Sequence, residues 1–182
     1  MDKEKQNIAL VNDRDQVTGY KDKLEVHRQG LLHRAFSIVV INRKGQWLLH
    51  QRALDKYHSG GSWTNTCCSH LGENETMESA CKDRLMSEMG ILATPEFIES
   101  FHYEAKFENG LIENEIDHVY IAFWEGDPEP DPEEVMDWKW MDPEEIKADL
   151  KRRPQDYSAW FPLIFDKFGV LISEKTQFVP GD

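Results

Sequence analysis

The sequence has 182 residues, 40% hydrophobic and 30% charged, a balance that excludes a disordered or collagen-like chain. Asp and Glu number 34 against 21 Lys and Arg, so the formal charge is −13 and the net field repels nucleic-acid phosphates. No apolar run reaches the roughly 20 residues of a membrane helix, and no signal-peptide stretch is visible at the start. We therefore expect a single cytoplasmic domain over 1–182, with neither nucleic-acid nor membrane partners.

The first half of the sequence predicts short strands separated by polar segments. Apolar and β-branched residues predict strands over 8–11, 36–41 and 47–50, and a turn at 43–46 makes the last two a hairpin. The intervening residues 12–34 are polar. Residues 55–62 are predicted to form a loop, which is followed by an unusual polar segment with two cysteines at 63–71.

The second half alternates helices with strands. A helix is predicted near 74–89, capped by Asn74 or Thr76 and ended by Gly90. Strands over 97–107 and 112–124 meet at an Asn-Gly hairpin signal. An acidic, proline-rich connector at 127–134 then precedes a strand over 135–141, a helix opened by Asp142-Pro143, a last helix near 158–168, and a tail at 169–182. Because strands and helices interleave, the fold class is α/β or α+β.

Two carboxylates stand close together on the strand predicted at 112–124. Side chains alternate along a strand, so Glu113 and Glu115 lie on one face. Carboxylates held this close repel each other unless a cation or a proton lies between them. The pair is a candidate metal site; the alternative is a solvated strand face in a very acidic protein.

Three histidines are candidates to complete such a site: His27, His33 and His70. Imidazoles together with carboxylates suit Zn²⁺, Mn²⁺ or Fe²⁺, whereas an all-oxygen site suits Mg²⁺. The spacing of the first two is not helical, so they would meet through a loop. The chain has 7 histidines and spacing alone does not select among them, so the alternative for each is an ordinary surface residue.

The polar segment at 63–71 contains a candidate base or nucleophile. Cys68 lies two residues before His70, which could hold it as a thiolate; the alternative is a buried small hydrophobic residue. If the segment is extended, Cys67 points to the opposite side, so at most one of the two faces a given site. An odd count of three cysteines, two of them adjacent, indicates a reducing compartment and not a disulfide scaffold.

Several basic residues are candidate phosphate ligands, namely Lys23, Arg52 and Lys56. Arg84 shares a helix face with Glu88, four residues further on. The alternative for all of them is solvated surface charge, and for the last two a surface ion pair worth under about 1 kcal/mol.

Residues 69–91 have the spacing of a Nudix box but lack several of its residues. Glu75, Gly90 and Ile91 match the box, whereas Ser69 replaces its first Gly, and Asp83-Arg84 and Ser87-Glu88 replace its Arg-Glu and Glu-Glu pairs. Over roughly residues 8–165 the sequence resembles one Nudix branch, the type I isopentenyl-diphosphate Δ-isomerases. The motifs that carry this resemblance are His33-Arg34-Ala35-Phe36-Ser37, Gln51-Arg52-Ala53-Leu54, Trp63-Thr64-Asn65, Cys68-Ser69-His70, Glu113-Asn114-Glu115 and Trp160.

The resemblance implies a Nudix-like mixed sheet sandwiched by helices. It also implies a metal-dependent conversion of isopentenyl diphosphate to dimethylallyl diphosphate, a step of isoprenoid biosynthesis, by a monomer or weak homodimer. Two metal sites are implied. Mn²⁺, Zn²⁺ or Mg²⁺ would be held by His27, His33, His70, Glu113 and Glu115, and Mg²⁺ would be held by Glu88 against the substrate diphosphate.

The resemblance assigns roles to the remaining candidates. The diphosphate would contact Lys23, Arg52, Lys56 and Arg84. Glu115 with Tyr103 would protonate the alkene, Cys68 would remove the allylic proton from the other face, and Trp160 would cover the hydrocarbon and stabilise the carbocation.

Two other functions remain open. A Nudix hydrolase would use Mg²⁺ and the box glutamates, of which Glu75 and Glu88 are too few, and would not need Cys68 or Trp160. A catalytically inactive binding domain on the same fold is the other alternative, and the complete set of ligands argues against it.

Overall fold

Strand β3 (His33–Ile41) lies at the centre of the sheet in the computed structural model, which describes residues 6–176. Its apolar, β-branched residues are buried along almost the whole strand, as predicted for 36–41. It pairs in parallel with β8 (Ile112–Phe123), which pairs with β7 (Glu96–Lys106) in an antiparallel hairpin. The predicted hairpin strands are therefore confirmed, and they form one half of the sheet.

The other half of the sheet is built from short strands. Over residues 6–176 the sheet has nine strands, and the other six are β1 (Asn7–Val11), β2 (Val17–Asp22), β4 (Trp47–Arg52), β5 (Trp63–Thr64), β6 (Cys67–His70) and β9 (Val135–Met141). The helices are α1 (Lys23–Gln29), α2 (Met77–Met89), α3 (Pro143–Arg152), the 3-10 turn Pro154–Asp156 and α4 (Phe161–Thr176). None of these helices is long and apolar enough to span a membrane.

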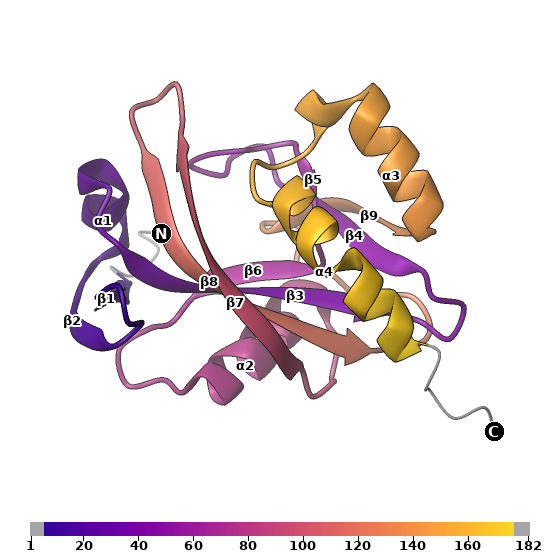
Figure 1. Cartoon of the computed structure of the whole chain (residues 1–182), viewed down its shortest axis with the longest axis horizontal. Helices are drawn as coiled ribbons and strands as arrows, with labels where there is room; N and C mark the ends of the chain where they lie inside the picture. Colours follow the sequence, from indigo (N-terminus) through magenta and orange to yellow (C-terminus); the bar gives the residue numbers. More distant parts are fainter. Residues whose placement is uncertain (1–5, 177–182) are drawn as a thin grey trace.

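Helices cover both faces of the sheet, α2 one face and α4 the other (Figure 1). Side chains alternate along β3, so Phe36 and Ile38 pack with α2, whereas Val39 and Ile41 pack with α4. The expected mixed sheet between helices is thus present.

Helix α2 has the ends that its sequence predicts. The Thr76 side chain accepts a hydrogen bond from the Ser79 backbone N–H, and Gly90 ends the helix at φ 65°, where a side chain is disfavoured. Helix α3 likewise begins at Pro143, directly after Asp142.

Two parts of the chain differ from the prediction. The polar stretch at 12–34 contains β2 and α1, a short helix capped by Asp22 and ended by Gly30. Helix α4 runs through Thr176, so the predicted tail is wrong for 169–176; Phe168 and Ile172 are buried at helical spacing and hold this part against the sheet. Residues 177–182 lie outside the described residues.

The edge of β3 is divided between two partners, and buried polar side chains fill the gap. Residues 35–38 pair with β6, whereas Val40 and Ile41 pair with β4. Between them, Thr66 accepts a hydrogen bond from the Val40 N–H at 2.8 Å and donates one to the Leu48 carbonyl at 2.6 Å. Backbone groups that a continuous ladder would have paired are thereby satisfied, which explains the polar composition of this segment.

The turn between α3 and α4 is held by Asp149. Its carboxylate accepts hydrogen bonds from Arg152 at 2.7 Å, Arg153 at 2.8 Å and the Tyr157 hydroxyl at 2.8 Å. The hydrogen bonds from these groups, Arg152 first, lower the pKa of Asp149 below its usual range. The turn they hold leads directly to Trp160.

We expect Asp149→Asn to destabilise the fold at neutral pH and to destabilise it less in acid. Because the pKa of Asp149 is lower in the folded state, its stabilisation is fully present above the unfolded pKa of about 4 and is lost progressively as the pH falls from there through the lower folded pKa. Urea denaturation at pH 7 and at pH 3 measures this, with Asp156→Asn, an exposed partner of Arg153, as the control. Equal losses at both pH values would contradict it.

Candidate active site

Four neighbouring strands present polar side chains on one face, the face that α4 covers further along the sheet. The register pairs His33 on β3 with Glu115 on β8, and Glu115 with Tyr103 on β7. On the other side of β3, Cys68 and His70 of β6 lie on the same face, because residues directly opposite in a sheet point the same way. The period of two therefore gathers these groups from strands far apart in sequence.

The five predicted metal ligands converge. One donor atom from each of His27, His33, His70, Glu113 and Glu115 lies within 4.8 Å of the others, and all five residues are buried. The closest pairs are His70 Nε2 to Glu115 Oε1 at 2.9 Å, His33 Nε2 to the same oxygen at 3.1 Å, and His27 Nε2 to Glu113 Oε2 at 3.3 Å. The cluster is therefore no solvated strand face.

Backbone contacts turn two of the histidines toward the cluster. The His27 Nδ1–H donates to the Lys23 carbonyl at 2.6 Å, and the His33 Nδ1–H donates to the Leu31 carbonyl at 2.8 Å. Each ring then presents Nε2 with its lone pair to the centre. His27 Nε2 and Glu113 Oε2 are buried without a hydrogen-bond partner, so the donor set fits a divalent cation placed between them.

Without a cation the two carboxylates differ strongly in proton affinity. Burial and then the Glu113 charge raise the pKa of Glu115 well above its usual value. At Glu113, burial acts to raise the pKa, but the close contacts with His27, His33 and His58 outweigh it and lower the pKa. Burial opposes the charged form of His33, but hydrogen bonds to Glu113 and Glu115 raise its pKa to about 10. In the absence of a cation, protons held by Glu115 and His33 therefore relieve the repulsion between the two carboxylates, which the sequence predicted.

Cys68 lies on the same face of the sheet as this cluster, in a set of buried polar contacts. Its Sγ is 3.0 Å from Asn65 Oδ1 and 3.6 Å from Ser37 Oγ, and the Trp160 Nε1–H donates to it at 3.2 Å. Burial, the largest effect, and then the Asp117 charge raise the pKa of the Cys68 thiol to about 12. Cys67 points to the other side, into the α2 core, as expected for an extended segment.

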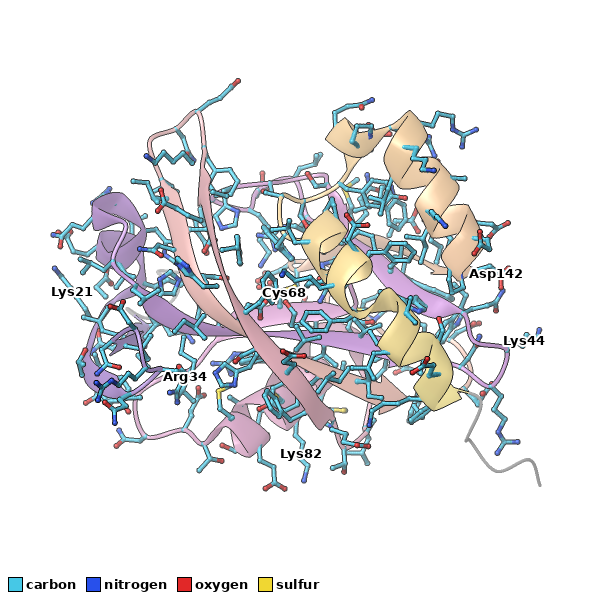
Figure 2. The ribbon with its side chains drawn as sticks, viewed as in Figure 1. Lys21, Arg34, Lys44, Cys68, Lys82 and Asp142 are labelled. Atoms are coloured by element: carbon cyan, nitrogen blue, oxygen red, sulfur yellow. The ribbon has the colours of Figure 1, made fainter. Side chains whose placement is uncertain are left out.

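The predicted catalytic and diphosphate-binding residues share one cavity of about 720 Å³. In Figure 2, Cys68 lies near the middle of the molecule, away from the labelled charged residues at its periphery. The cavity is lined by Cys68, Tyr103, Glu115 and Trp160, by Glu88, and by the four predicted cations Lys23, Arg52, Lys56 and Arg84. Its volume is that of a small-molecule site.

The four cations have partners within the protein. Lys23 Nζ lies 4.9 Å from the centre of the Tyr57 ring, and Arg52 Cζ lies 5.3 Å from that of Trp160. Lys56 forms an ion pair with Glu134.

Arg84 pairs with Glu75 at 3.2 Å, and not with Glu88 as the surface alternative would have it. The Cys67 thiol instead contacts Glu88, with Sγ 3.5 Å from Oε2. Glu88 is therefore not neutralised by Arg84, and it lines the cavity.

Comparison with known proteins identifies the family. A family model described as the NUDIX domain matches residues 31–161. A protein of Aromatoleum aromaticum named isopentenyl-diphosphate Delta-isomerase 2 is 42% identical over 160 residues, covering 88% of this chain and 85% of that protein. A protein of Serratia proteamaculans named isopentenyl-diphosphate Delta-isomerase is 41% identical, covering 89% and 90%. The chain belongs to the isopentenyl-diphosphate Delta-isomerase family of Nudix proteins.

Solved structures agree on the fold. The Deinococcus radiodurans protein DR0079 matches with a TM-score of 0.68 at 20% identity, covering 81% of this chain and 90% of that one. A MutT protein of Methanosarcina mazei matches with a TM-score of 0.64 at 18% identity, covering 77% and 94%. At these identities the similarity shows the Nudix fold alone.

Some residues of this isomerase-family site were missed from the sequence. His58 and Tyr57 line the cavity from a loop that has no periodic pattern. Asp117 is buried and accepts a hydrogen bond from Ser37 at 2.8 Å. Its signal was present, because a period of two from Glu113 and Glu115 reaches Asp117 next.

Asn65 ties the cysteine to the tryptophan in this family member. Its Nδ2 donates to the buried carbonyls of Ile38 and Cys67 at 3.1 and 3.0 Å, and its Oδ1 accepts from Trp160 Nε1 at 3.3 Å. The amide thus spans the gap in the sheet.

We expect Asn65→Ala to lower the free energy of unfolding by about 2–4 kcal/mol, because it removes the hydrogen bonds to two buried carbonyls. Urea denaturation measures the loss. Asn114→Ala is the control, since it removes one hydrogen bond to the Gly30 carbonyl and one to the exposed His102, and should cost under about 1 kcal/mol. A loss no larger than that of the control would show that Asn65 does not hold the segment.

Proposed function

We propose that this chain converts isopentenyl diphosphate to dimethylallyl diphosphate by moving one proton onto the hydrocarbon and removing another. The observation that carries the proposal is the placement of Cys68 and of the Tyr103–Glu115 pair on the walls of one cavity that four cations also line. A reaction that adds a proton at one carbon and removes one from its neighbour needs an acid and a base in contact with the same substrate.

The two proton transfers balance without a further reactant. The alkene electron pair takes a proton at the terminal carbon, which leaves a tertiary carbocation. Loss of a proton from the neighbouring allylic carbon returns the electron pair as the new double bond. An alkene is a very weak base, so the acid must be well placed and water must be excluded.

Glu115 and Tyr103 form the proposed proton donor. The Tyr103 hydroxyl donates to Glu115 Oε2 at 2.8 Å, while Glu115 Oε1 faces His33 and His70. One carboxylate oxygen is thus directed to the metal ligands and the other to the cavity side. This arrangement supports delivery of the proton through the tyrosine hydroxyl or beside it.

Cys68 is the proposed acceptor of the allylic proton, for which its thiol must first lose its own proton; burial raises the pKa of this thiol, and the Arg52 charge acts in the opposite direction. A hydrogen bond from Trp160 Nε1 is available to stabilise the negative sulfur. Trp160 is the proposed partner of the carbocation, because an aromatic face attracts a cation that has no oxygen ligand. Its ring already lies beside the Arg52 guanidinium.

The diphosphate is proposed to lie at the end of the cavity lined by Lys23, Arg52, Lys56 and Arg84, with Mg²⁺ held by Glu88. These charges offset the repulsion from a chain of net charge −13. Lys56 would exchange Glu134 for a phosphate oxygen, and Arg84 would do the same with Glu75.

The histidine and glutamate cluster is the proposed site of a second divalent ion. Three imidazoles and two carboxylates suit Mn²⁺ or Zn²⁺, and Mg²⁺ is also accepted by such carboxylates. When bound, this ion would supply positive charge that acidifies the proton held by Glu115. The ion would be held beside Glu115 by the other four residues of the cluster, His27, His33, His70 and Glu113.

Hydrolysis of a diphosphate is the second candidate, and the Nudix box argues against it. Glu75 accepts a hydrogen bond from the Gly72 N–H at 2.8 Å, so it serves the fold. Glu88 alone then remains for metal.

We propose that the enzyme lies in the cytoplasm, because its three cysteines are all unpaired thiols. We also propose that it is a monomer or weak homodimer.

The two neighbouring cysteines provide the test of this function. Cys68→Ala should lower the rate of isomerisation by about 10³-fold or more, because no other side chain is placed to remove the allylic proton. Cys67→Ala should leave turnover nearly unchanged and cost about 1–2 kcal/mol of stability, since Cys67 packs in the α2 core. Both variants are assayed for dimethylallyl diphosphate and for released phosphate.

Near-normal isomerisation by Cys68→Ala would remove Cys68 from the mechanism. Phosphate release that persists in both cysteine variants, with no isomer formed by the unaltered protein, would favour the hydrolase.

The two metal sites should separate by mutation. Glu88→Ala should weaken the use of Mg²⁺ with the substrate and leave the metal of the histidine cluster in place. His70→Ala should lose that metal, because its Nε2 is one of the five converging donors. Metal analysis of protein purified without chelator, together with the Mg²⁺ dependence of the rate, measures both. Loss of all metal in Glu88→Ala would contradict two separate sites.

A further inference from the structure

His58 is a buried histidine outside the five-ligand cluster, on the loop between β4 and β5. Its ring stacks on Phe107 at 4.6 Å with an interplanar angle of 9°, and meets the edge of Trp160 at 5.8 Å. It is only 6% exposed, and it lines the cavity together with its loop neighbours Lys56 and Tyr57. Packing on two sides therefore fixes the direction of its Nε2.

That nitrogen is aimed at a proposed metal ligand. His58 Nε2 lies 2.5 Å from Glu113 Oε1, while Glu113 Oε2 faces His27 at 3.3 Å and His33 at 3.7 Å. The carboxylate is thus divided, one oxygen toward the cluster and one toward the loop. Glu113 itself is buried, so water does not compete for either oxygen.

Three other ligands are also oriented by a partner behind them. Lys23 and Leu31 carbonyls hold His27 and His33, and the Tyr103 hydroxyl holds Glu115. Such partners fix the direction of a ligand and raise metal affinity. Glu113 differs in that its partner comes from the loop that carries Lys56.

The loop is fastened at two more points. The Arg52 guanidinium donates to the His58 carbonyl at 3.3 Å, and Asn109 Nδ2 donates to the Tyr57 carbonyl at 2.8 Å. The first contact connects His58 to a proposed diphosphate ligand, and the second connects the loop to the β7–β8 hairpin that carries Glu113. The loop thus touches both ends of the site.

We infer that His58 is a positioning residue that orients Glu113 for the divalent ion and couples metal binding to the order of the loop carrying Lys56. The inference rests on the proposed metal site. His58 Nε2 lies 2.5 Å from Glu113 Oε1, and in the proposed metal-bound site it would donate its proton to that oxygen and leave Oε2 for the ion. Because coupling is reciprocal, a bound ion orders the loop, and an ordered loop strengthens ion binding.

Two substitutions separate the hydrogen bond from the packing. His58→Phe keeps a ring against Phe107 but has no donor, and should weaken Mn²⁺ affinity by about 10–100-fold. His58→Gln has no ring but places an amide N–H near the same point, and should bind Mn²⁺ within about threefold of the unaltered protein. His102→Ala, which removes an exposed histidine bonded to Asn114, is the control and should change nothing.

Mn²⁺ affinity is measured on metal-free protein by competition with a chelator. The opposite order, with His58→Gln weaker than His58→Phe, or equal affinity in all variants, would overturn the inference. If the unaltered protein itself binds no Mn²⁺, Zn²⁺ or Mg²⁺ at the cluster, the proposed metal site fails first, so the two failures are distinguishable.

The coupling has its own test, whose main arm uses the unaltered protein. Mn²⁺ should slow amide hydrogen exchange at residues 54–60 of that protein, and this protection should be absent in His58→Phe. Exchange in this loop that is the same with and without Mn²⁺, while affinity is normal, would overturn the coupling.

Discussion

Two carboxylates on one face of β8 constrain the whole active site. Glu113 and Glu115 are buried, and two buried negative charges this close are unfavourable without a cation, a proton or several donors around them. Four histidines surround them: His27 of α1, His33 of β3, His70 of β6, and His58 of the loop between β4 and β5. The positions of α1, the start of β3 and the end of β6 therefore follow from the need to compensate this pair.

The register of the central strands is what meets this need. A shift by one residue between β3 and β8 would turn Glu113 and Glu115 into the α2 core and remove His33 from the cluster. The same face of β3 becomes apolar at Val39 and Ile41, where α4 packs. A polar end with the candidate metal ligands and an apolar end packed against α4 thus lie on one continuous surface of the sheet.

The main strands and the pairing of the two glutamates on one face could be predicted from the sequence. The choice of the histidines that surround them could not. The strands at 36–41, 97–107 and 112–124 have strong patterns, and the period of two along a strand is enough to place Glu113 and Glu115 on the same face. The histidines are different: spacing does not select His27, His33 and His70 among seven, and the family resemblance supplied them. In the structure, donor atoms of these three histidines and of the two glutamates lie within 4.8 Å of one another.

Two features lay beyond sequence patterns. Helix α1 has only seven residues, and a helix of this length depends on tertiary packing of Val26 and His27 more than on its own propensity. The position of His58 depends on how a loop packs against Phe107, a contact between distant segments that no local pattern records.

The parallel pairing of β3 with β8 also has a consequence for the lifetime of the folded enzyme. His33 and Glu115 are 82 positions apart, so the ligand cluster is complete only after this slow, non-local pairing has formed. An ion that binds the finished cluster cannot accelerate the early steps of folding, but it must leave or be exposed before the strands separate. Divalent metal would then act chiefly on the unfolding rate, and a cell short of that metal would lose the protein to proteolysis before it lost the capacity to fold it.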